Sequence, residues 1–256
     1  MKALFLLVTL TFTTKLLIAQ PTHYTVANAH SHNDYVNPQP FTTAYQAQFG
    51  SMEADIFLWN DSLIVGHTLN DIKYKRTLEQ LYLNPLAKQV TANKGYPYKD
   101  TSRHLQLLID IKTQAVNTLQ SLIQHLAKYP QLIASSHIHI VITGNRPEAN
   151  AFVQYPSFIM FDGNIGSDYS EAALSKIALL SDDLTNYTKW KGNEPIPAKD
   201  KMVVDALVTK VHNLHKNIRF WASPDTEIAW QQLMQMHVDY INTDKIELLA
   251  AYLNKQ

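Results

Sequence analysis

Short apolar runs alternate with segments of helical spacing along almost the whole chain, and this alternation limits the folds that the chain can adopt. The apolar runs are rich in β-branched and aromatic residues and have the length of buried strands. We expect about eight strands, at residues 24–29, 52–58, 105–111, 138–143, 158–161, 177–180, 218–221 and 240–242. We expect helices at residues 41–48, 115–128, 199–215, 226–236 and 245–253, and loops at residues 91–102 and 186–199. Alternating strands and helices indicate a parallel sheet with crossover helices.

The number of strands favours a closed barrel. About eight strand–helix units in 256 residues fit an α/β fold of the (β/α)8 TIM-barrel type, which commonly forms a single domain. An open doubly wound sheet usually has fewer strands and a glycine-rich first turn. The chain has 7 glycines and neither GxGxxG nor GxxxxGK[ST], so dinucleotide binding and P-loop chemistry lose their usual sequence support.

Residues 1–20 differ in composition from the rest of the chain. An early lysine precedes an uncharged, mostly apolar run from Ala3 to Thr14, and the segment ends in Ile18-Ala19-Gln20 just before Pro21. This order is typical of a secretory signal peptide, and we expect cleavage near Ala19 or Gln20. The run is shorter than the roughly 20 residues that span a bilayer, and Lys15 interrupts it, so we expect no stable membrane anchor. The expected product is one barrel domain at residues 21–256, exported to the periplasm or secreted.

The charge balance excludes several classes of partner. The chain has 22 basic and 22 acidic residues, which provide no net field for holding a nucleic acid or an acidic membrane surface. It has no cysteine, and therefore no disulfide, thiolate chemistry or lipid attachment through cysteine. We expect a monomer that acts on a small molecule.

Two imidazoles stand in the segment AHSHNDY, at the end of the first expected strand. His30 and His32 are two residues apart, so both can project to one side of an extended chain as an acid/base or metal-binding pair. Active sites of TIM barrels form at this end of the strands. The alternative is an ordinary His-x-His pair in a surface loop.

Three carboxylates stand at the next two strands. Glu53 and Asp55 share one face of their strand, and Asp110 and Lys112 share a face of the strand that follows. Carboxylates inside a barrel repel one another unless a cation lies between them. An all-oxygen set favours Mg²⁺ or Ca²⁺ over Zn²⁺, and the choice between those two stays open. The alternatives are a solvated strand end and a surface Asp–Lys pair. His67, after a short apolar run, is by itself an ordinary loop histidine.

The ordered series AHSHNDY, SMEADIFL, LIVGHT and LLIDIKT resembles the N-terminal half of the glycerophosphodiester phosphodiesterase and phosphatidylinositol phospholipase C-like superfamily. The C-terminal half agrees, with ITGN, with FW followed by PD, and with DYINTD, which is similar to the closing strand of the family. The resemblance covers nearly the whole chain after residue 20.

The resemblance implies a role for each matching residue. Glu53, Asp55 and Asp110 match the metal ligands, and His67 matches the second catalytic histidine. The first catalytic histidine is His30, with His32 as the competing assignment. Further positions complete the expected substrate site: Lys112, which matches a phosphate-contacting lysine of related secreted phospholipase D enzymes, and Asn145 and Trp221, which end expected strands.

Three departures from the family pattern affect the expected substrate. His-Ser-His replaces the common His-Arg-Gly, and His237 stands where a glycine is frequent. Asp110 stands where many members have Glu, and an aspartate at this position is closer to the sphingomyelinase D-like branch. We therefore expect a secreted, metal-dependent phosphodiesterase that hydrolyses a glycerophosphodiester or a related lipid-derived diester, through a cyclic phosphate as in the family. The alternatives are a catalytically silent binding protein and a metal-dependent phosphomonoesterase on the same barrel.

Overall fold

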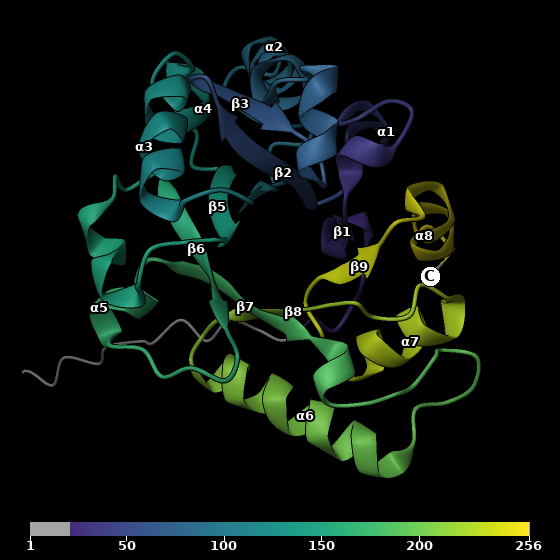
Figure 1. The fold of residues 1–256 in the computed structure, drawn as a ribbon. Coiled ribbons are helices and arrows are strands. Elements are labelled where there is room, and N and C mark those ends of the chain that lie inside the picture. Colours follow the sequence, from purple (N-terminus) through teal and green to yellow (C-terminus); the bar gives the residue numbers. More distant parts are fainter. Residues whose placement is uncertain (1–20, 256) are drawn as a thin grey trace, which may run out of the picture.

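The computed structural model describes residues 21–255, so the expected signal peptide lies outside the described residues. In the described part, eight parallel strands form a ring with helices between them (Figure 1). The strands are β1 (Ala29–Ser31), β2 (Ser51–Trp59), β4 (Leu105–Ile111), β5 (Ile138–Gly144), β6 (Ile159–Asn164), β7 (Ile177–Asp183), β8 (Asn217–Trp221) and β9 (Ile241–Thr243). Their order is β8-β7-β6-β5-β4-β2-β1-β9, and one bridge between Arg219 and Tyr240 joins β8 to β9. The predicted TIM barrel is confirmed.

Helices cover the outside of the ring. They are α1 (Thr42–Gln46), α2 (Asn84–Ala92), α3 (Ala115–Leu126), α4 (Pro130–Ile133), α5 (Glu171–Leu174), α6 (Ala198–Asn213), α7 (Glu227–Gln235) and α8 (Ile246–Leu253). The five expected helices are present with ends shifted by a few residues. None of the helices in residues 21–255 is both long enough and apolar enough to cross a membrane.

Two predicted elements need correction. The first strand was expected from residue 24 but begins at Ala29, because Thr25 and Asn28 cap each other's backbone and turn residues 26–28 into a 3-10 helix. No helix was expected between His67 and the loop predicted from residue 91, but a π-helical turn at Glu79–Leu83 continues into α2, which ends at Ala92, inside that predicted loop. A further strand, β3 (Ser62–Val65), pairs antiparallel with β2 as a hairpin.

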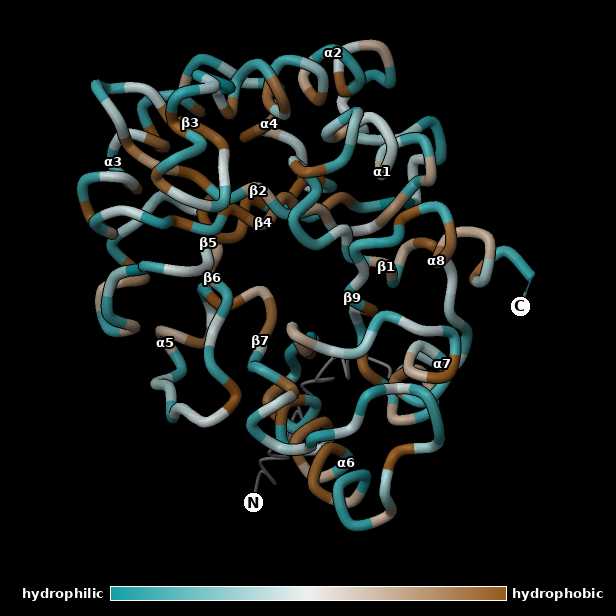
Figure 2. The backbone as a smooth tube through the Cα atoms, turned by 45° about the vertical axis from the view of Figure 1, so that its right-hand side comes forward, coloured by the Kyte–Doolittle hydropathy of each residue, from teal (hydrophilic) through white to brown (hydrophobic). Residues whose placement is uncertain are grey.

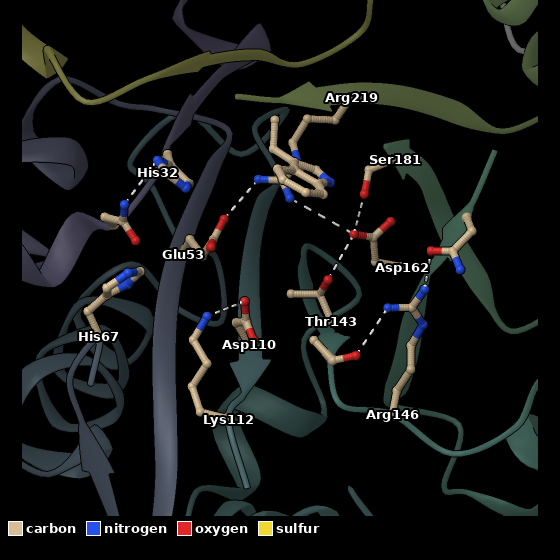
Figure 3. Close-up of a pocket in the computed structure, with 14 residues that line it drawn as sticks. His32, Glu53, His67, Asp110, Lys112, Thr143, Arg146, Asp162, Ser181 and Arg219 are labelled. Atoms are coloured by element: carbon tan, nitrogen blue, oxygen red, sulfur yellow. Dashed lines mark hydrogen bonds and ion pairs between the residues drawn. The ribbon is translucent and has the colours of Figure 1, made fainter. Parts of the chain in front are cut away.

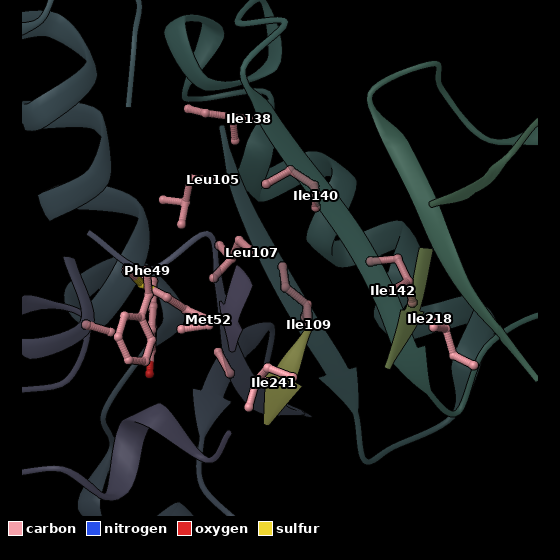
Figure 4. Close-up of a cluster of buried hydrophobic side chains, with 14 of the residues drawn as sticks. Phe49, Met52, Leu105, Leu107, Ile109, Ile138, Ile140, Ile142, Ile218 and Ile241 are labelled. Atoms are coloured by element: carbon pink, nitrogen blue, oxygen red, sulfur yellow. The ribbon is translucent and has the colours of Figure 1, made fainter. Parts of the chain in front are cut away.

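The strands bury apolar side chains on both faces. Their outward faces pack against the helices, where isoleucine and leucine dominate (Figure 4). Figure 2 shows the same division, with hydrophobic residues on the strands and the inner sides of the helices. Inside the ring, Leu108, Val141 and Leu179 form a small separate cluster. These three side chains fill the interior of the barrel below the carboxyl ends of the strands. The polar residues therefore lie above them.

Candidate active site

A cavity of about 360 Å³ opens at the carboxyl ends of the strands (Figure 3). All but two of the residues that line it, Gly144 and Trp221, have charged or otherwise polar side chains: His32, Asn33, Glu53, His67, Asp110, Lys112, Thr143, Gly144, Arg146, Asp162, Asn164, Ser181, Arg219 and Trp221. The cavity lies at the low end of the volumes of small-molecule sites.

The three predicted carboxylates meet at one point of this cavity. Asp55 of β2 and Asp110 of β4 stand directly opposite each other in the sheet, and Glu53 lies on the same face as Asp55. Each can offer an oxygen, and these oxygens lie within 4.8 Å of one another. One buried oxygen each of Asp55 and Asp110 (Oδ1) has no hydrogen-bond partner. Convergent carboxylates with partnerless oxygens fit a hard divalent cation such as Mg²⁺ or Ca²⁺.

Two cationic side chains hold these carboxylates. Lys112 Nζ donates to Asp55 Oδ2 at 2.9 Å and to Asp110 Oδ2 at 2.8 Å. Arg219 Nη1 donates to Glu53 Oε2 at 2.8 Å. Burial raises the pKa of Glu53, but Arg219 and the hydrogen bond with His30 outweigh burial and hold this pKa well below its ordinary value. The pKa of Asp55 is raised, because burial and the charges of Glu53 and Asp110 outweigh Lys112.

His30 lies beneath the cavity. Its side chain is fully buried, and its ring nitrogens contact Ser51 Oγ at 2.7 Å and Glu53 Oε2 at 2.9 Å. Burial and the charge of Arg219 lower the pKa of His30 to about 4, so the ring is neutral near pH 7. Within the described structure His30 supports Glu53 and does not line the cavity.

His32 and His67 do line the cavity, on the same side as Glu53 (Figure 3). His32 Nδ1 lies 2.8 Å from Asp244 Oδ1. Burial would lower the pKa of His32, but the hydrogen bond with Asp244 and the negative charge of Glu53 raise it. His67 Nδ1 lies 3.3 Å from Asp55 Oδ2, and its side chain is 62% exposed. Both imidazoles are therefore oriented by a carboxylate and accessible to a ligand.

The rest of the AHSHNDY segment positions these groups. The Tyr35 hydroxyl donates to Asp55 Oδ2 at 2.7 Å and lies 3.2 Å from His67 Nδ1. Asp34 is buried and accepts hydrogen bonds from the Ser31 hydroxyl and from the backbone N–H of Phe41, which fold the loop after β1. The segment thus holds β1 and its loop in place and also supplies His32 to the cavity lining.

The far side of the cavity comes from β5 to β8. Thr143 and Ser181 donate to Asp162 Oδ2, and Arg146 donates to Asn164 Oδ1 at 2.6 Å. Trp221 lines the cavity and is 41% exposed. The predicted substrate residue Asn145 lies outside the cavity lining, where its side chain donates to the Thr113 carbonyl.

Sequence reasoning missed Arg219 and Arg146. Arg219 lies two residues before Trp221 on β8, and a cation inside the apolar run NIRFW was a usable sign of an inward-facing residue. Arg146 follows β5 in a loop, where spacing carries little information. Tyr35 stood in a quoted motif, but only the fold brings its hydroxyl to Asp55.

Comparisons with known proteins find similarity to phosphodiesterases. Residues 22–148 match the AIM6-like phosphodiesterase domain, and residues 217–247 match the glycerophosphoryl diester phosphodiesterase family. Altered inheritance of mitochondria protein 6 of Eremothecium gossypii is 25% identical over 282 residues, which cover 89% of this chain and 69% of that protein. The homologue from Arthroderma benhamiae is 25% identical over 259 residues, which cover 87% of this chain and 82% of that protein.

A solved structure shares the fold. The crystal structure of a glycerophosphodiester phosphodiesterase from Parabacteroides distasonis has a TM-score of 0.57 and 14% sequence identity, and the match covers 89% of this chain and 97% of that chain. The two matched segments contain both the acidic cluster and Arg219. The comparisons thus show an AIM6-like phosphodiesterase domain at residues 22–148, a match of residues 217–247 to the glycerophosphoryl diester phosphodiesterase family, and the fold of a solved glycerophosphodiester phosphodiesterase.

Proposed function

We propose that the chain is a divalent-cation-dependent phosphodiesterase in which His32 is the base and His67 is the acid. The observation that carries this proposal is the convergence of Glu53, Asp55 and Asp110, two of them with partnerless oxygens, beside two accessible imidazoles. A divalent cation held by these carboxylates would neutralise the charge of a phosphodiester.

His32 is suited to be the base. An ionised Asp244 can only accept, so His32 carries its proton on Nδ1 and keeps Nε2 free to accept a proton. His32 takes the proton of a hydroxyl, from the substrate itself or from water, as that oxygen bonds to phosphorus. The bond from phosphorus to the departing oxygen breaks, and His67 gives its proton to that oxygen. Lys112, which is partly exposed in the cavity, orients the phosphate as a point charge.

This assignment chooses between the two histidines of the first motif. His30 touches Glu53 and Arg219 and has no exposed atom, whereas His32 lines the cavity. We propose His30 as a positioning residue for Glu53, and His32 as the catalytic partner of His67.

The test is hydrolysis of bis(p-nitrophenyl) phosphate and glycerophosphocholine, with EDTA, Mg²⁺ and Ca²⁺ as variables. Turnover is expected only with a cation, and it should fall at least roughly a hundred-fold in His32→Ala, His67→Ala and Asp110→Asn. The exposed His23→Ala variant is the matched control. Faster hydrolysis of p-nitrophenyl phosphate than of both diesters would favour a phosphomonoesterase. A folded protein that binds the cation and hydrolyses neither substrate class would favour a binding role.

We further propose export of the chain and action on a small or lipid-derived diester as a monomer. The composition of residues 1–20 supports export. N-terminal sequencing of the exported protein is expected to begin near Ala19 or Gln20, and a retained Met1 would contradict this proposal.

A further inference from the structure

The side of the cavity opposite the proposed catalytic groups carries a cationic side chain, Arg146, that the proposed chemistry does not use. The catalytic groups come from β1, β2, β4 and the loop after β3, whereas Arg146 follows β5 on the opposite side (Figure 3). Gly144 has a φ of +69°, and this left-handed turn begins the loop that leads to Arg146. Asn145 ties the same loop to the Thr113 carbonyl. Both fixed points lie directly before Arg146, so the loop is held where it leads into the arginine.

Arg146 differs from the other cations of the cavity. Lys112 and Arg219 are both paired with carboxylates. Arg146 contacts only neutral acceptors, the side-chain oxygen of Asn164 at 2.6 Å and the Gly144 carbonyl at 3.3 Å. Among the described residues no carboxylate lies within ion-pair distance of it. A guanidinium has five N–H donors in a planar fork that suits carboxylate and phosphate, and most of these donors stay free.

The neighbouring Asp162 also has unused capacity. It is 1% exposed and lines the cavity, yet Thr143 and Ser181 both donate to Oδ2, and Oδ1 has no partner. Its ion-pair contact is with Arg219 at 4.0 Å. A buried carboxylate oxygen without a donor, at the wall of a cavity, marks a place where a ligand's hydrogen-bond donor fits.

We propose that this wall is a second anion subsite, in which Arg146, oriented by Asn164, binds a carboxylate or phosphate group on one of the two alcohols of the diester. The proposal rests on the proposed phosphodiesterase function and specifies its substrate class. The Asp162 oxygen then accepts from a hydroxyl of the same alcohol. A diester with a single anionic phosphate uses only the catalytic side of the cavity.

The surroundings of Arg146 limit what extends beyond it. A second hollow shares Gly144, Arg146 and Asn164 with the main cavity, and Glu148 and Asp168, which do not line the main cavity, line this hollow. These carboxylates repel a further anion there. The anionic group is therefore expected on the inner side of Arg146, between Arg146 and the catalytic groups.

The test uses matched chromogenic diesters that differ in one group. These are p-nitrophenyl aryl phosphates whose second ring carries a para carboxylate, phosphonate or neutral carboxamide. For the unmodified protein, kcat/KM is expected to be roughly ten-fold higher for each anionic diester than for the amide, because a charge-assisted bidentate contact is worth about that factor. The ranking of carboxylate and phosphonate identifies the preferred anion. Arg146→Gln should reduce the ratio to about one, and Asn164→Ala should reduce it in part. Lys88→Gln, an exposed charge on α2, should keep it.

In the kinetic assay, two results would overturn the subsite: an unchanged preference in Arg146→Gln, or an equal loss for all three diesters, which would assign Arg146 to the scissile phosphate. Calorimetric binding of the three corresponding aryl phosphates supplies a readout without turnover. If no diester is hydrolysed but the anionic aryl phosphates bind more tightly and Arg146→Gln abolishes that difference, the subsite stands and the proposed chemistry falls. Equal binding of the three compounds would refute the subsite directly.

Discussion

Tyr35 links the acidic cluster to His67 through a single hydroxyl, which contacts Asp55 and His67 Nδ1. In Tyr35→Phe we expect kcat to fall roughly ten-fold with little change in KM, because the ring still fills its place but His67 loses a partner. The pH–rate profile should shift as well, which a merely structural role would not cause. Steady-state kinetics across pH measure both effects. Tyr129→Phe, which removes an exposed hydroxyl bound to Asn84, is the control, and an unchanged Tyr35→Phe profile would refute the positioning role.

Gly144 lies against the acidic cluster. A Cβ at this position would stand 1.9 Å from Asp110 Oδ1, and φ is +69°. Gly144→Ala is therefore expected to lose about 1–2 kcal/mol through backbone strain and also to displace Asp110. We expect weaker stabilisation by Mg²⁺ or Ca²⁺ in thermal unfolding.

The control for this variant separates the two effects. Gly95 has a φ of +101° and open space around its Cβ position. Gly95→Ala should show a similar loss of stability and an unchanged response to the cation. Equal responses in both variants would mean that Asp110 does not bind the ion.

The candidate site was only partly predictable at this scale. Glu53, Asp55 and Asp110 could be found because the strand period puts i and i+2 on one face and parallel neighbours align. The sequence could not show which of His30 and His32 lines the cavity, because the end of a strand does not reveal which of the two rings is buried below the cavity. That choice depends on Ser51 and Glu53 below and on Asp244 from the other end of the chain.

Among elements, most of the parallel strands were predicted within a few residues, since most contain a largely apolar run buried on both faces. The exception is β1, which is short and carries His30 and Ser31. The hairpin strand β3 was not predicted as a strand of its own. Asn60 and Asp61 both have positive φ, so a two-residue turn of a kind that these residue types favour was the available signal. Helix α2 was missed because Pro85 interrupts its apolar pattern, and a π-helical turn before the proline accommodates this break.

The amino ends of β4 and β5 carry a stack of imidazoles. The His104 ring lies 4.5 Å from that of His137 and 5.6 Å from that of His139, between centroids. Burial lowers the pKa of His104 and of His139, and the neighbouring histidines lower both further. The unfolded chain, with pKa values near 6.5, therefore takes up protons first as the pH falls. The contribution of His104 and His139 to the free energy of unfolding is complete above the pKa of the unfolded chain. It is lost as the pH falls below that pKa.

The corresponding experiment is thermal unfolding between about pH 7 and about pH 5. The melting temperature of the unmodified protein should fall more steeply on acidification than that of the His104→Gln/His139→Gln variant. Both proteins keep the buried His30, which acts in the same direction, so some slope should remain. His23→Gln is the control, and parallel curves for all three proteins would show that the stack does not contribute.

For the molecule as a whole, the weakest part of the ring is the seam between β8 and β9. One backbone bridge joins these strands, and β9 has three residues. Arg219 supplements this pairing, because it reaches from β8 to Glu53 of β2, to His30 of β1 and to Asn242 of β9. Arg219, which binds carboxylates of the cavity, thus also closes the barrel.

Replacing Arg219 by Met should show this double role. A buried Glu53 without its cation is expected to cost about 3–5 kcal/mol of unfolding free energy in denaturant titrations. The loss should be much smaller in the Glu53→Gln/Arg219→Met double variant, because no buried charge remains there. A divalent cation can take over part of the role of Arg219 by neutralising Glu53, so it should stabilise Arg219→Met more than the unmodified protein. If the cation stabilises both equally, Glu53 does not bind it, and the seam and the metal site are energetically separate.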